Sequence, residues 1–293
     1  MDSLAGRVAV VTGGAGGVGR AMGERFALDG MKVVLGDVEA PALDATVAEL
    51  CADGLDVLGT VTDVADYESV EALRDFALEA HGAVHVVCNN AGVGAGASGQ
   101  MWEHELNDWR WAFGVNVWGV INGIKAFVPG MVASGEPGHV VNTSSGNGGI
   151  VPLPNTAIYA ASKSTVVTLT EVLWAQLQQV GAAVSASVLF PGPNILRTGL
   201  FSSWRNRPAE YTNANPPAKP PTTIESFEKA MADAGVDLVY TPTEEVADRV
   251  AAAILADQFW ILPPSDRSDE QITARAASMI ARTNPVYIRE LGG

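Results

Sequence analysis

Short apolar runs alternate with segments of helical periodicity along the first two-thirds of the chain. This alternation is typical of stacked β-α-β units that build a parallel sheet. The runs are almost uniformly apolar, as expected of strands that helices cover on both faces. The pattern predicts strands over residues 7–12, 32–37, 57–61, 84–88, 139–143, 184–190 and 258–262. It predicts helices over residues 17–28, from about 41, 67–80, 107–133, 156–179, 244–255 and 269–282.

The segment 199–234 departs from this alternation, because five prolines interrupt it and no regular element is expected before about Ile224. A loop this long inside a compact domain is usually functional or disordered. We interpret it as an extended substrate-binding loop, or lid, with Trp204 as a candidate for its apolar surface. The sequence has no internal repeat, so we predict a single domain over residues 1–293 with a helical tail at 265–293.

Composition excludes several classes of protein. The chain is 47% apolar and only 17% charged, which excludes a disordered acidic chain. Its net charge of −15 would repel nucleic acid and anionic membranes, so neither is expected as a partner. Two cysteines, Cys51 and Cys88, are too few for a disulfide framework, and we expect both to be free and buried.

The sequence also bears on localisation and metal binding. The first four residues carry no basic group, and the apolar run Val8–Val11 is too short for the core of a signal peptide. No stretch approaches the roughly 20 uncharged apolar residues of a membrane span. We therefore predict a cytoplasmic protein. His81 and His85 are separated by a break between helix and strand, so no metal site is expected.

A glycine-rich turn, residues 12–19, joins the first predicted strand to the first predicted helix. Glycines there permit a tight turn and let backbone amides approach a pyrophosphate at the helix N-terminus. The turn satisfies two overlapping patterns, one through Gly14, Gly16 and Gly19, the other through Thr12, Gly13, Gly17 and Gly19. A second group of glycines, at Gly94, Gly96 and Gly99, opens no helix and is interpreted as a flexible loop.

Asp37 ends the second strand, 18 residues after Gly19. A carboxylate at this position can accept hydrogen bonds from an adenosine ribose, and it would repel a 2′-phosphate. No Arg or Lys follows in residues 38–40. These features favour NAD over NADP as the cofactor. The alternative for Asp37 itself is that it binds no cofactor and is an ordinary solvated aspartate at a strand end.

Tyr159 and Lys163 are four residues apart near the start of a predicted helix, so their side chains share a face. An adjacent ammonium group favours the phenolate form of a tyrosine. Ser144 and Ser145 end the preceding strand, and ligands bind at such strand ends in open parallel sheets. Taken alone, the Tyr-Lys pair could equally be an ordinary surface pair.

Together these motifs resemble the short-chain dehydrogenase/reductases in order and approximate spacing, over about residues 5–200 and the last strand. The matching positions are Thr12–Gly19, Asp63-Val64, Asn89-Asn90-Ala91-Gly92, Asn116, Ser145, Tyr159-x-x-x-Lys163 and Pro191-Gly192. The resemblance implies an α/β fold: a single-domain Rossmann fold with a doubly wound, seven-stranded, mostly parallel sheet and helices on both faces. It also implies a homotetramer or homodimer.

The resemblance assigns the catalytic roles. Ser145 would orient and polarise the substrate oxygen, and Tyr159 would be the general acid and base. Lys163 would hold the nicotinamide ribose and lower the pKa of Tyr159, while Asn116 would support a water molecule in the proton relay. Ser145 is chosen over Ser144 because it lies 14 residues before Tyr159, close to the usual family spacing.

The resemblance also implies the cofactor contacts. Asp63 and Val64 would contact the adenine, and Asn90 would lie along the adenosine ribose. The segment after Pro191-Gly192 is longer than usual, so either Ile195 or Thr198 could contact the carboxamide, with Ile195 preferred. The full predicted cofactor set is Gly13, Gly17, Val18, Gly19, Asp37, Asp63, Val64, Asn90, Ala91, Gly92, Tyr159, Lys163, Pro191, Gly192 and Ile195.

The loop 199–234, together with residues 127–139, resembles a branch of bacterial members that act on bulky alcohols, including the Cα-dehydrogenases of lignin-type aryl ethers. We therefore predict an NAD-dependent dehydrogenase that interconverts a secondary alcohol and a ketone, the substrate being bulky and apolar or aromatic. Two alternatives stay open. One is an NADP-linked ketoreductase of the acyl-carrier type, and the other is a catalytically silent dinucleotide-binding sensor.

Overall fold

The structure, a computed structural model, describes residues 1–94, 99–215 and 222–288. The glycine loop expected around Gly96, part of the expected lid and the last residues of the expected tail lie outside the described residues.

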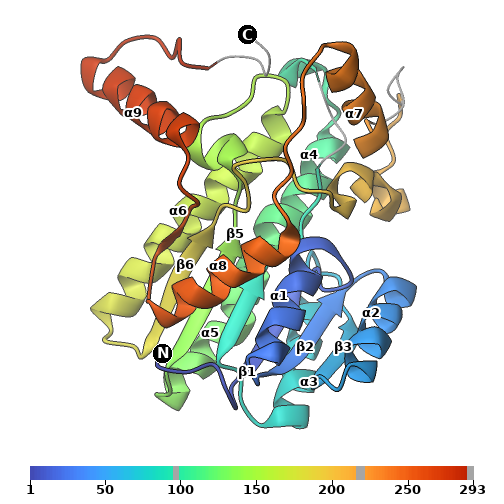
Figure 1. Cartoon of the computed structure of the whole chain (residues 1–293), viewed down its shortest axis with the longest axis vertical. Coiled ribbons are helices and arrows are strands. Elements are labelled where there is room, and N and C mark those ends of the chain that lie inside the picture. Colours follow the sequence, from blue (N-terminus) through green and yellow to red (C-terminus); the bar gives the residue numbers. More distant parts are fainter. Residues whose placement is uncertain (95–98, 216–221, 289–293) are drawn as a thin grey trace.

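The described residues form one seven-stranded parallel sheet with the order β3-β2-β1-β4-β5-β6-β7 (Figure 1). The order reverses between β1 and β4, and ligands bind beyond the carboxyl ends of strands at such a reversal. The strands are β1 Val8–Thr12, β2 Lys32–Asp37, β3 Val57–Val61, β4 Val86–Asn89, β5 Gly138–Thr143, β6 Val184–Leu189 and β7 Trp260–Ile261. The predicted Rossmann-type fold is confirmed.

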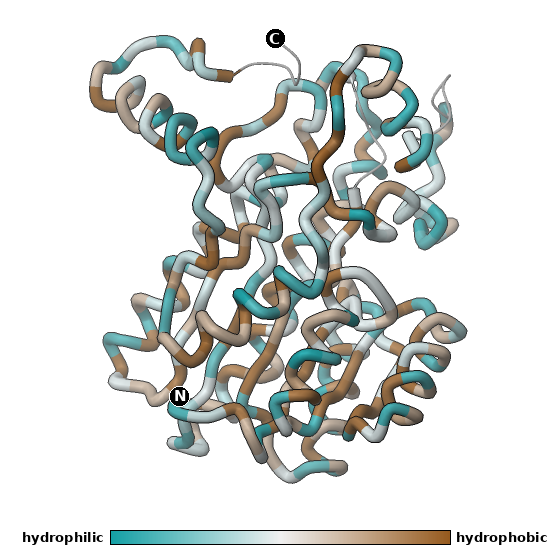
Figure 2. Tube along the Cα trace, viewed as in Figure 1, coloured by the Kyte–Doolittle hydropathy of each residue, from teal (hydrophilic) through white to brown (hydrophobic). Residues whose placement is uncertain are grey.

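Helices cover both faces of the sheet, and further helices rise above its carboxyl edge (Figure 1). The α-helices are α1 Gly17–Leu28, α2 Ala40–Ala52, α3 Tyr67–His81, α4 Leu106–Phe113, α5 Gly119–Ser134, α6 Ala157–Gln179, α7 Ile224–Asp233, α8 Thr243–Leu255 and α9 Asp266–Ala281. Shorter helical turns are η1 Met101–Glu103, η2 Gly114–Trp118, η3 Gly146–Ile150, η4 Gly199–Asn206 and η5 Ala209–Tyr211. Figure 2 shows that the apolar residues concentrate along the central strands.

Local capping explains where several helices begin and end. The Asp66 side chain accepts a hydrogen bond from the Glu68 amide and so caps the start of α3. Gly82 ends the same helix with a φ of 78°, a backbone conformation that glycine adopts without strain. Glu105 and Asp108 form a reciprocal capping box at the start of α4.

The predicted helix 107–133 is continuous in space but not uniform. A π-helical turn, η2, separates α4 from α5. The helical span Leu106–Ser134 contains an 18-residue window with a mean hydropathy of 1.2, which by length and composition alone is apolar enough to cross a membrane. The span includes Lys125 as well as Asp108 and Arg110, so it is not a run of about 20 uncharged apolar residues, the feature that the sequence was predicted to lack. Moreover, α5 packs against α3 and β4, and core helices commonly meet the same criterion.

Three further expectations need correction. Residues 199–224 are not devoid of regular structure, because η4 and η5 form there, and the Thr198 side chain caps η4 by accepting from the Leu200 amide. The last strand is shorter than residues 258–262, since only Trp260–Ile261 pair with β6 at the sheet edge. Cys51 is exposed on α2 rather than buried, and its thiol contacts the carbonyl oxygen of Val57.

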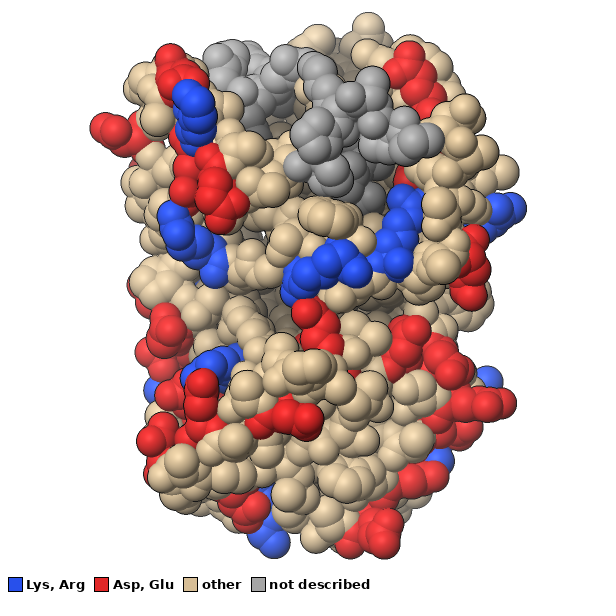
Figure 3. Space-filling model, turned by 90° about the vertical axis from the view of Figure 1, so that its right-hand side faces the viewer, with Lys and Arg blue, Asp and Glu red and all other residues tan. Residues whose placement is uncertain are grey.

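Charged side chains are distributed unevenly on the face shown in Figure 3. Acidic groups are scattered over much of it, as the net charge of −15 requires. A row of basic side chains crosses its middle, with acidic side chains directly beneath.

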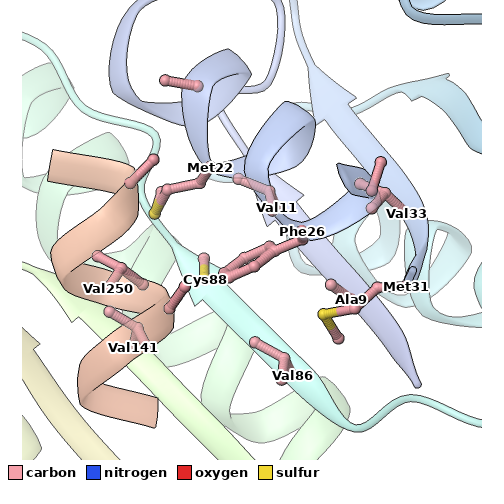
Figure 4. Packing of buried hydrophobic residues seen from close by; sticks show 14 of the residues in the cluster. Ala9, Val11, Met22, Phe26, Met31, Val33, Val86, Cys88, Val141 and Val250 are labelled. Carbon is pink, nitrogen blue, oxygen red and sulfur yellow. The ribbon is translucent and has the colours of Figure 1, made fainter. Parts of the chain in front are cut away.

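Two apolar layers separate the sheet from its helices. On one face Met22 and Phe26 of α1 and Val250 of α8 lie among strand residues such as Cys88 (Figure 4). On the other face α3, α5 and α6 pack against the alternate strand positions, such as Val10. Because both faces are covered, the polar groups at the carboxyl ends of the strands form the edge available to a ligand.

Candidate active site

The glycine-rich turn between β1 and α1 fits a backbone that must come close to other groups. Gly13 and Gly17 have φ values of +69° and +54°, which residues with a Cβ rarely adopt. A Cβ on Gly19 would lie 2.0 Å from the carbonyl oxygen of Gly13. Gly16 has no side chain to cap α1, so within the described part of the chain this cap residue leaves the first amides of the helix without a side-chain acceptor. These amides can bind an anion.

The carboxylate of Asp37 connects the end of β2 to this turn. One oxygen accepts a hydrogen bond from the Ala15 amide at 3.0 Å, and the other accepts one from the Glu39 amide at 3.0 Å. The side chain is only partly buried, so further lone pairs of the carboxylate face outward. Asp37 therefore occupies the strand-end position at which it was predicted.

Thr12 links β1 to the end of β4, a role that motif spacing alone did not suggest. Its hydroxyl accepts hydrogen bonds from the amides of Asn90 and Ala91 at 3.0 and 3.1 Å. The side-chain amide of Asn90 donates to the Thr12 carbonyl at 3.0 Å. This geometry gives Asn90 a structural role, while its contact with a ribose stays a prediction.

Asp63 and Val64 follow β3 at the same edge of the sheet. The Asp63 carboxylate accepts a hydrogen bond from the Ala65 amide at 2.9 Å. Val64 is buried, and its carbonyl accepts from Asn122 of α5 at 2.9 Å. Their contact with adenine stays a prediction.

Ser144 and Ser145 end β5 but do different things. The Ser144 hydroxyl is buried and donates to the carbonyl oxygen of Lys163 at 2.7 Å, so it is committed to the backbone of α6. The Ser145 side chain is partly exposed and forms a hydrogen bond with the Tyr159 hydroxyl. Of the two serines, Ser145 is the one in contact with Tyr159.

Tyr159 and Lys163 lie on the first turns of α6, beside the end of β5. The Lys163 ammonium is 5.8 Å from the centre of the Tyr159 ring and donates to the Thr143 carbonyl at 2.9 Å. Burial lowers the pKa of Lys163 to about 8. Gly92 lies close to Lys163, because a Cβ there would lie 3.3 Å from the Lys163 ammonium.

The pKa of Tyr159 departs from the expectation. Burial raises it above its ordinary value, and the hydrogen bond with Ser145 offsets this only in part. Among the described residues the Lys163 ammonium donates to the Thr143 carbonyl and not to the phenol, and the net direction of the Tyr159 pKa is upward.

Asn116 lies in the π-helical turn η2 and is completely buried. Its side-chain oxygen accepts from the Val93 amide at 2.8 Å, and its side-chain nitrogen donates to the Val93 carbonyl at 3.0 Å. The same nitrogen donates to the Ser162 hydroxyl at 3.0 Å. Asn116 therefore fixes the loop after β4 to η2 and α6, and its predicted water contact is untested.

The segment after β6 returns to the glycine-rich turn. The Pro191 carbonyl accepts a hydrogen bond from Arg249 at 2.7 Å, and the Ile195 carbonyl accepts one from the Thr241 amide at 2.9 Å. Thr198 packs on Gly17, where an added Cβ would lie 3.1 Å from the Thr198 side chain. Of the two open candidates, Thr198 is thus the one that contacts the turn.

Residues 199–213, here called the strap, cross from this turn to the start of α4. The Ser203 hydroxyl accepts a hydrogen bond from the Gly94 amide at 3.0 Å. At the far end Arg207 forms an ion pair of 2.6 Å with Asp108. At the near end Arg205 pairs with Glu39. No local pattern in the sequence indicates these three contacts, because their partners lie about a hundred residues or more apart.

The site thus combines an anion-binding turn, a carboxylate at the second strand end, and a Ser-Tyr-Lys group at the fifth. The class of protein defined by this fold and site is a dinucleotide-binding oxidoreductase. The profile of the family described as short chain dehydrogenase matches residues 7–208. The chain therefore belongs to the short-chain dehydrogenase family. Among the described residues, no group of His, Cys, Asp and Glu could hold a metal ion.

Two curated relatives are similar in sequence. The chain is 41% identical over 186 residues to a 1-deoxy-11-beta-hydroxypentalenate dehydrogenase from Streptomyces exfoliatus. The match covers 64% of this chain and 66% of that protein, just under two thirds of its length. The chain is 34% identical over 211 residues to a C alpha-dehydrogenase from Sphingobium sp. strain SYK-6, covering 72% and 67% of the two chains.

Solved structures extend the similarity to nearly the whole chain. A short-chain dehydrogenase/reductase from Burkholderia phymatum in complex with NAD is 38% identical, with a TM-score of 0.89. The match covers 99% of this chain and 100% of that one. An actinorhodin polyketide ketoreductase with NADPH is 28% identical, with a TM-score of 0.70 over 88% and 94% of the two chains.

Proposed function

We propose that this protein is an NAD-dependent dehydrogenase that interconverts a bulky, apolar or aromatic secondary alcohol and its ketone. The observation that carries the proposal is the contact of Ser145 with Tyr159, beside the buried ammonium of Lys163 at the carboxyl end of β5. This group lies at the same edge of the sheet as the glycine-rich turn. A substrate carbon near Tyr159 and a dinucleotide bound to the glycine-rich turn would therefore lie at the same edge of the sheet.

The residues present fit a dinucleotide. The first amides of α1 have no side-chain acceptor and suit a pyrophosphate, and a Cβ at Gly19 would fill the space that the turn requires. The outward lone pairs of Asp37 suit the hydroxyl groups of an adenosine ribose. When bound, nicotinamide supplies the acceptor or donor of the hydride.

The chain itself supplies the proton chemistry. In alcohol oxidation the Tyr159 phenolate takes the proton of the substrate hydroxyl, and Ser145 donates a hydrogen bond that holds the substrate oxygen. The buried ammonium of Lys163 favours the phenolate electrostatically, although it forms no hydrogen bond to it. Asn116 keeps the loop after β4 in place beside Lys163.

The substrate class is supported by relatives and by the strap. The curated relatives are named as dehydrogenases of a hydroxypentalenate and of a Cα position. In the strap, Phe201 stacks on Phe227 of α7 with ring centres 5.6 Å apart. Apolar side chains of this kind suit a bulky, weakly polar substrate.

NAD is the proposed cofactor because Asp37 would repel the 2′-phosphate of NADP. The Burkholderia phymatum relative with a bound NAD supports this choice. The similarity to a ketoreductase with NADPH keeps an NADP-linked ketoreductase as the second candidate. Greater activity of the unmodified protein with NADP than with NAD would favour that candidate, and Asp37→Ala should shift the preference towards NADP if Asp37 acts as proposed.

A homodimer or homotetramer is also proposed. Several large apolar side chains are exposed on the described surface, including those of Trp118, Trp174 and Trp260. Apolar surface of this kind commonly marks contacts between proteins.

The test of the proposed function is Tyr159→Phe. A panel of aliphatic, alicyclic and aryl secondary alcohols with NAD, measured by NADH absorbance, first identifies a substrate. Tyr159→Phe should then lower kcat by at least about a hundredfold, because it removes the general base. Tyr67→Phe, at the start of α3, is the matched control and should retain kcat. Near wild-type turnover of Tyr159→Phe at saturating NAD would show that another group takes the proton.

A further inference from the structure

An ion pair crosses from the strap to the end of β2. Arg205 donates from Nε to one Glu39 oxygen at 3.1 Å and from a terminal nitrogen to the other oxygen. Asn206 adds a hydrogen bond to the same carboxylate at 2.8 Å. Burial works to raise the pKa of Glu39, but these hydrogen bonds outweigh it and leave the pKa below its ordinary value.

This pair lies beside the proposed ribose site. Glu39 follows Asp37 by two residues, and its amide donates to the Asp37 carboxylate at 3.0 Å. The Arg205 guanidinium also reaches Gly199, where an added Cβ would lie 3.2 Å from a terminal nitrogen. Since the neighbouring Thr198 packs on Gly17, the guanidinium lies between the end of β2 and the rim of the glycine-rich turn.

A guanidinium in this position could bind a phosphate group. Arginine binds phosphate through parallel hydrogen bonds, and an arginine near this strand end commonly accommodates the 2′-phosphate of NADP. Here all three of its nitrogens already form hydrogen bonds. Nε and one terminal nitrogen bind Glu39, and the other terminal nitrogen donates to the Ser202 carbonyl at 2.8 Å, to the Ser202 hydroxyl at 2.9 Å and to the Gly199 carbonyl at 3.2 Å.

We propose that Glu39 is a specificity-determining residue that keeps Arg205 from binding the 2′-phosphate of an adenine dinucleotide. With the pair intact, a 2′-phosphate meets the carboxylates of Asp37 and Glu39. With Glu39 neutral, the Arg205 side chain is free to turn towards the phosphate. The inference rests on the proposed function, because it concerns discrimination between NAD and NADP at the same site.

Direct titration with NADH and with NADPH, followed by nicotinamide fluorescence, tests the proposal without a known substrate. We expect the wild type to bind NADH more tightly than NADPH. Glu39→Gln should tighten NADPH binding about tenfold, the size of a hydrogen bond to a charged group, and change NADH binding by less than about threefold. Glu39→Ala is a second variant with the same expected result.

Two variants separate the guanidinium from simple charge removal. In Glu39→Gln/Arg205→Gln most of the gain for NADPH should disappear, because the phosphate then lacks its partner. Glu49→Gln is the matched control: it removes the same charge from α2 and breaks the 2.7 Å ion pair with Arg20, and it should leave both affinities unchanged. A gain in Glu39→Gln no larger than in the control would overturn the proposal, as would a gain that persists without Arg205.

The outcomes distinguish this inference from the function on which it rests. If the wild type binds neither dinucleotide, or binds NADPH more tightly, the proposed cofactor and this inference both fail. If the wild type prefers NADH and the ratio of the two affinities does not change in either Glu39 variant, only the role of Glu39 is refuted.

Discussion

Lys163 shows how one residue can serve a reaction at the expense of stability. Its side chain is 4% exposed and has one hydrogen bond, to the Thr143 carbonyl. Burial lowers its pKa from 10.5 to about 8, so folding makes the proton easier to lose, although the ammonium form still predominates at pH 7. The unfolded chain holds the proton up to pH 10.5, and this group therefore costs stability at neutral pH and below. The cost diminishes as the pH rises from about 8 towards 10.5.

Lys163→Met should therefore stabilise the protein while it removes activity. At pH 7 and without cofactor we expect the free energy of unfolding to rise by about 1–3 kcal/mol, since the variant no longer buries a charge. Urea unfolding followed by tryptophan fluorescence measures this change. Lys229→Met, at an exposed position of α7, is the matched control and should not stabilise the protein. A destabilised Lys163→Met would show that the hydrogen bond to Thr143 outweighs the cost of burial.

Individual hydrogen bonds also distinguish Ser145 from Ser144 as the serine that contacts Tyr159. Spacing to Tyr159 favoured Ser145, and in the structure the Ser144 hydroxyl is occupied by the Lys163 carbonyl. The direction of the Tyr159 pKa was not predictable from the sequence. It depends on how completely the phenol is removed from water, which is a property of the folded chain.

At the scale of elements, the glycine-rich turn and α1 form one unit. The sequence offered two overlapping glycine patterns, which differ in whether Gly16 or Gly17 is required. Gly17 has a positive φ, whereas Gly16 has an extended backbone and nothing within 4 Å of an added Cβ. Gly14 of the other pattern is also constrained, since a Cβ there would lie 2.7 Å from Leu35, so Gly16 is the one glycine of the two patterns that the turn does not require.

Gly19→Ala and Gly16→Ala should behave differently. The new Cβ at residue 19 would press on the Gly13 carbonyl, so we expect a loss of about 3 kcal/mol in the free energy of unfolding and loss of NADH binding. At residue 16, the helix cap, the loss should be at most about 1 kcal/mol. Thermal or urea unfolding of both variants gives the comparison. Equal destabilisation would mean that the turn adjusts more easily than its contacts indicate.

The helix through η2 illustrates what periodicity misses. The sequence predicts a continuous helix over residues 107–133, and the structure has one with a π-helical turn at Gly114–Trp118. One extra residue in a turn costs helical hydrogen bonding, and such turns frequently occur at functional sites. Here the turn holds Asn116 against both polar groups of Val93, a contact with a loop whose position no local pattern specifies.

At the scale of the whole molecule, a buried polar chain joins three strands. His139 of β5 meets the Ser187 hydroxyl of β6 at 2.6 Å, and that hydroxyl donates to the Gln258 carbonyl before β7 at 2.7 Å. The hydroxyl has one proton, so the His139 ring must be the donor in the first contact. Burial lowers the pKa of His139 to about 4, and the ring is therefore neutral in the folded protein at pH 7.

This histidine should make folding sensitive to acid. The unfolded chain takes up a proton as the pH falls below about 6.5, whereas the folded ring resists protonation down to about 4. Its contribution to stability is present above pH 6.5 and is lost between pH 6.5 and 4, to a maximum of about 3 kcal/mol. His139→Gln should flatten the pH dependence of the urea midpoint in this range. An unchanged slope in the variant would place the acid sensitivity in other groups.

The strap is also a property of the whole molecule. Its ion pairs to Glu39 and Asp108 connect the second strand end to the start of α4 and bridge the edge that bears Ser145 and Tyr159. The sequence predicted a functional loop here from its prolines and its length. It did not predict which residues of the loop are anchored or to what.

The sequence by itself determined the strands, the glycine-rich turn, and the order of Asp37, Ser145, Tyr159 and Lys163 along the chain. Periodicity and spacing report local conformation and which faces are buried, and those are decided within a few residues. Only the tertiary structure decided that Thr198 packs on Gly17, that the Tyr159 pKa rises, and that Arg205 reaches Glu39. The contact of Arg205 with Glu39 bears on the choice of cofactor. No basic residue follows Asp37 in residues 38–40, yet Arg205, 166 residues after Glu39, lies beside Glu39 in the folded chain. Contacts over such separations, and the loss of water around a side chain, exist only once the chain has closed around its core.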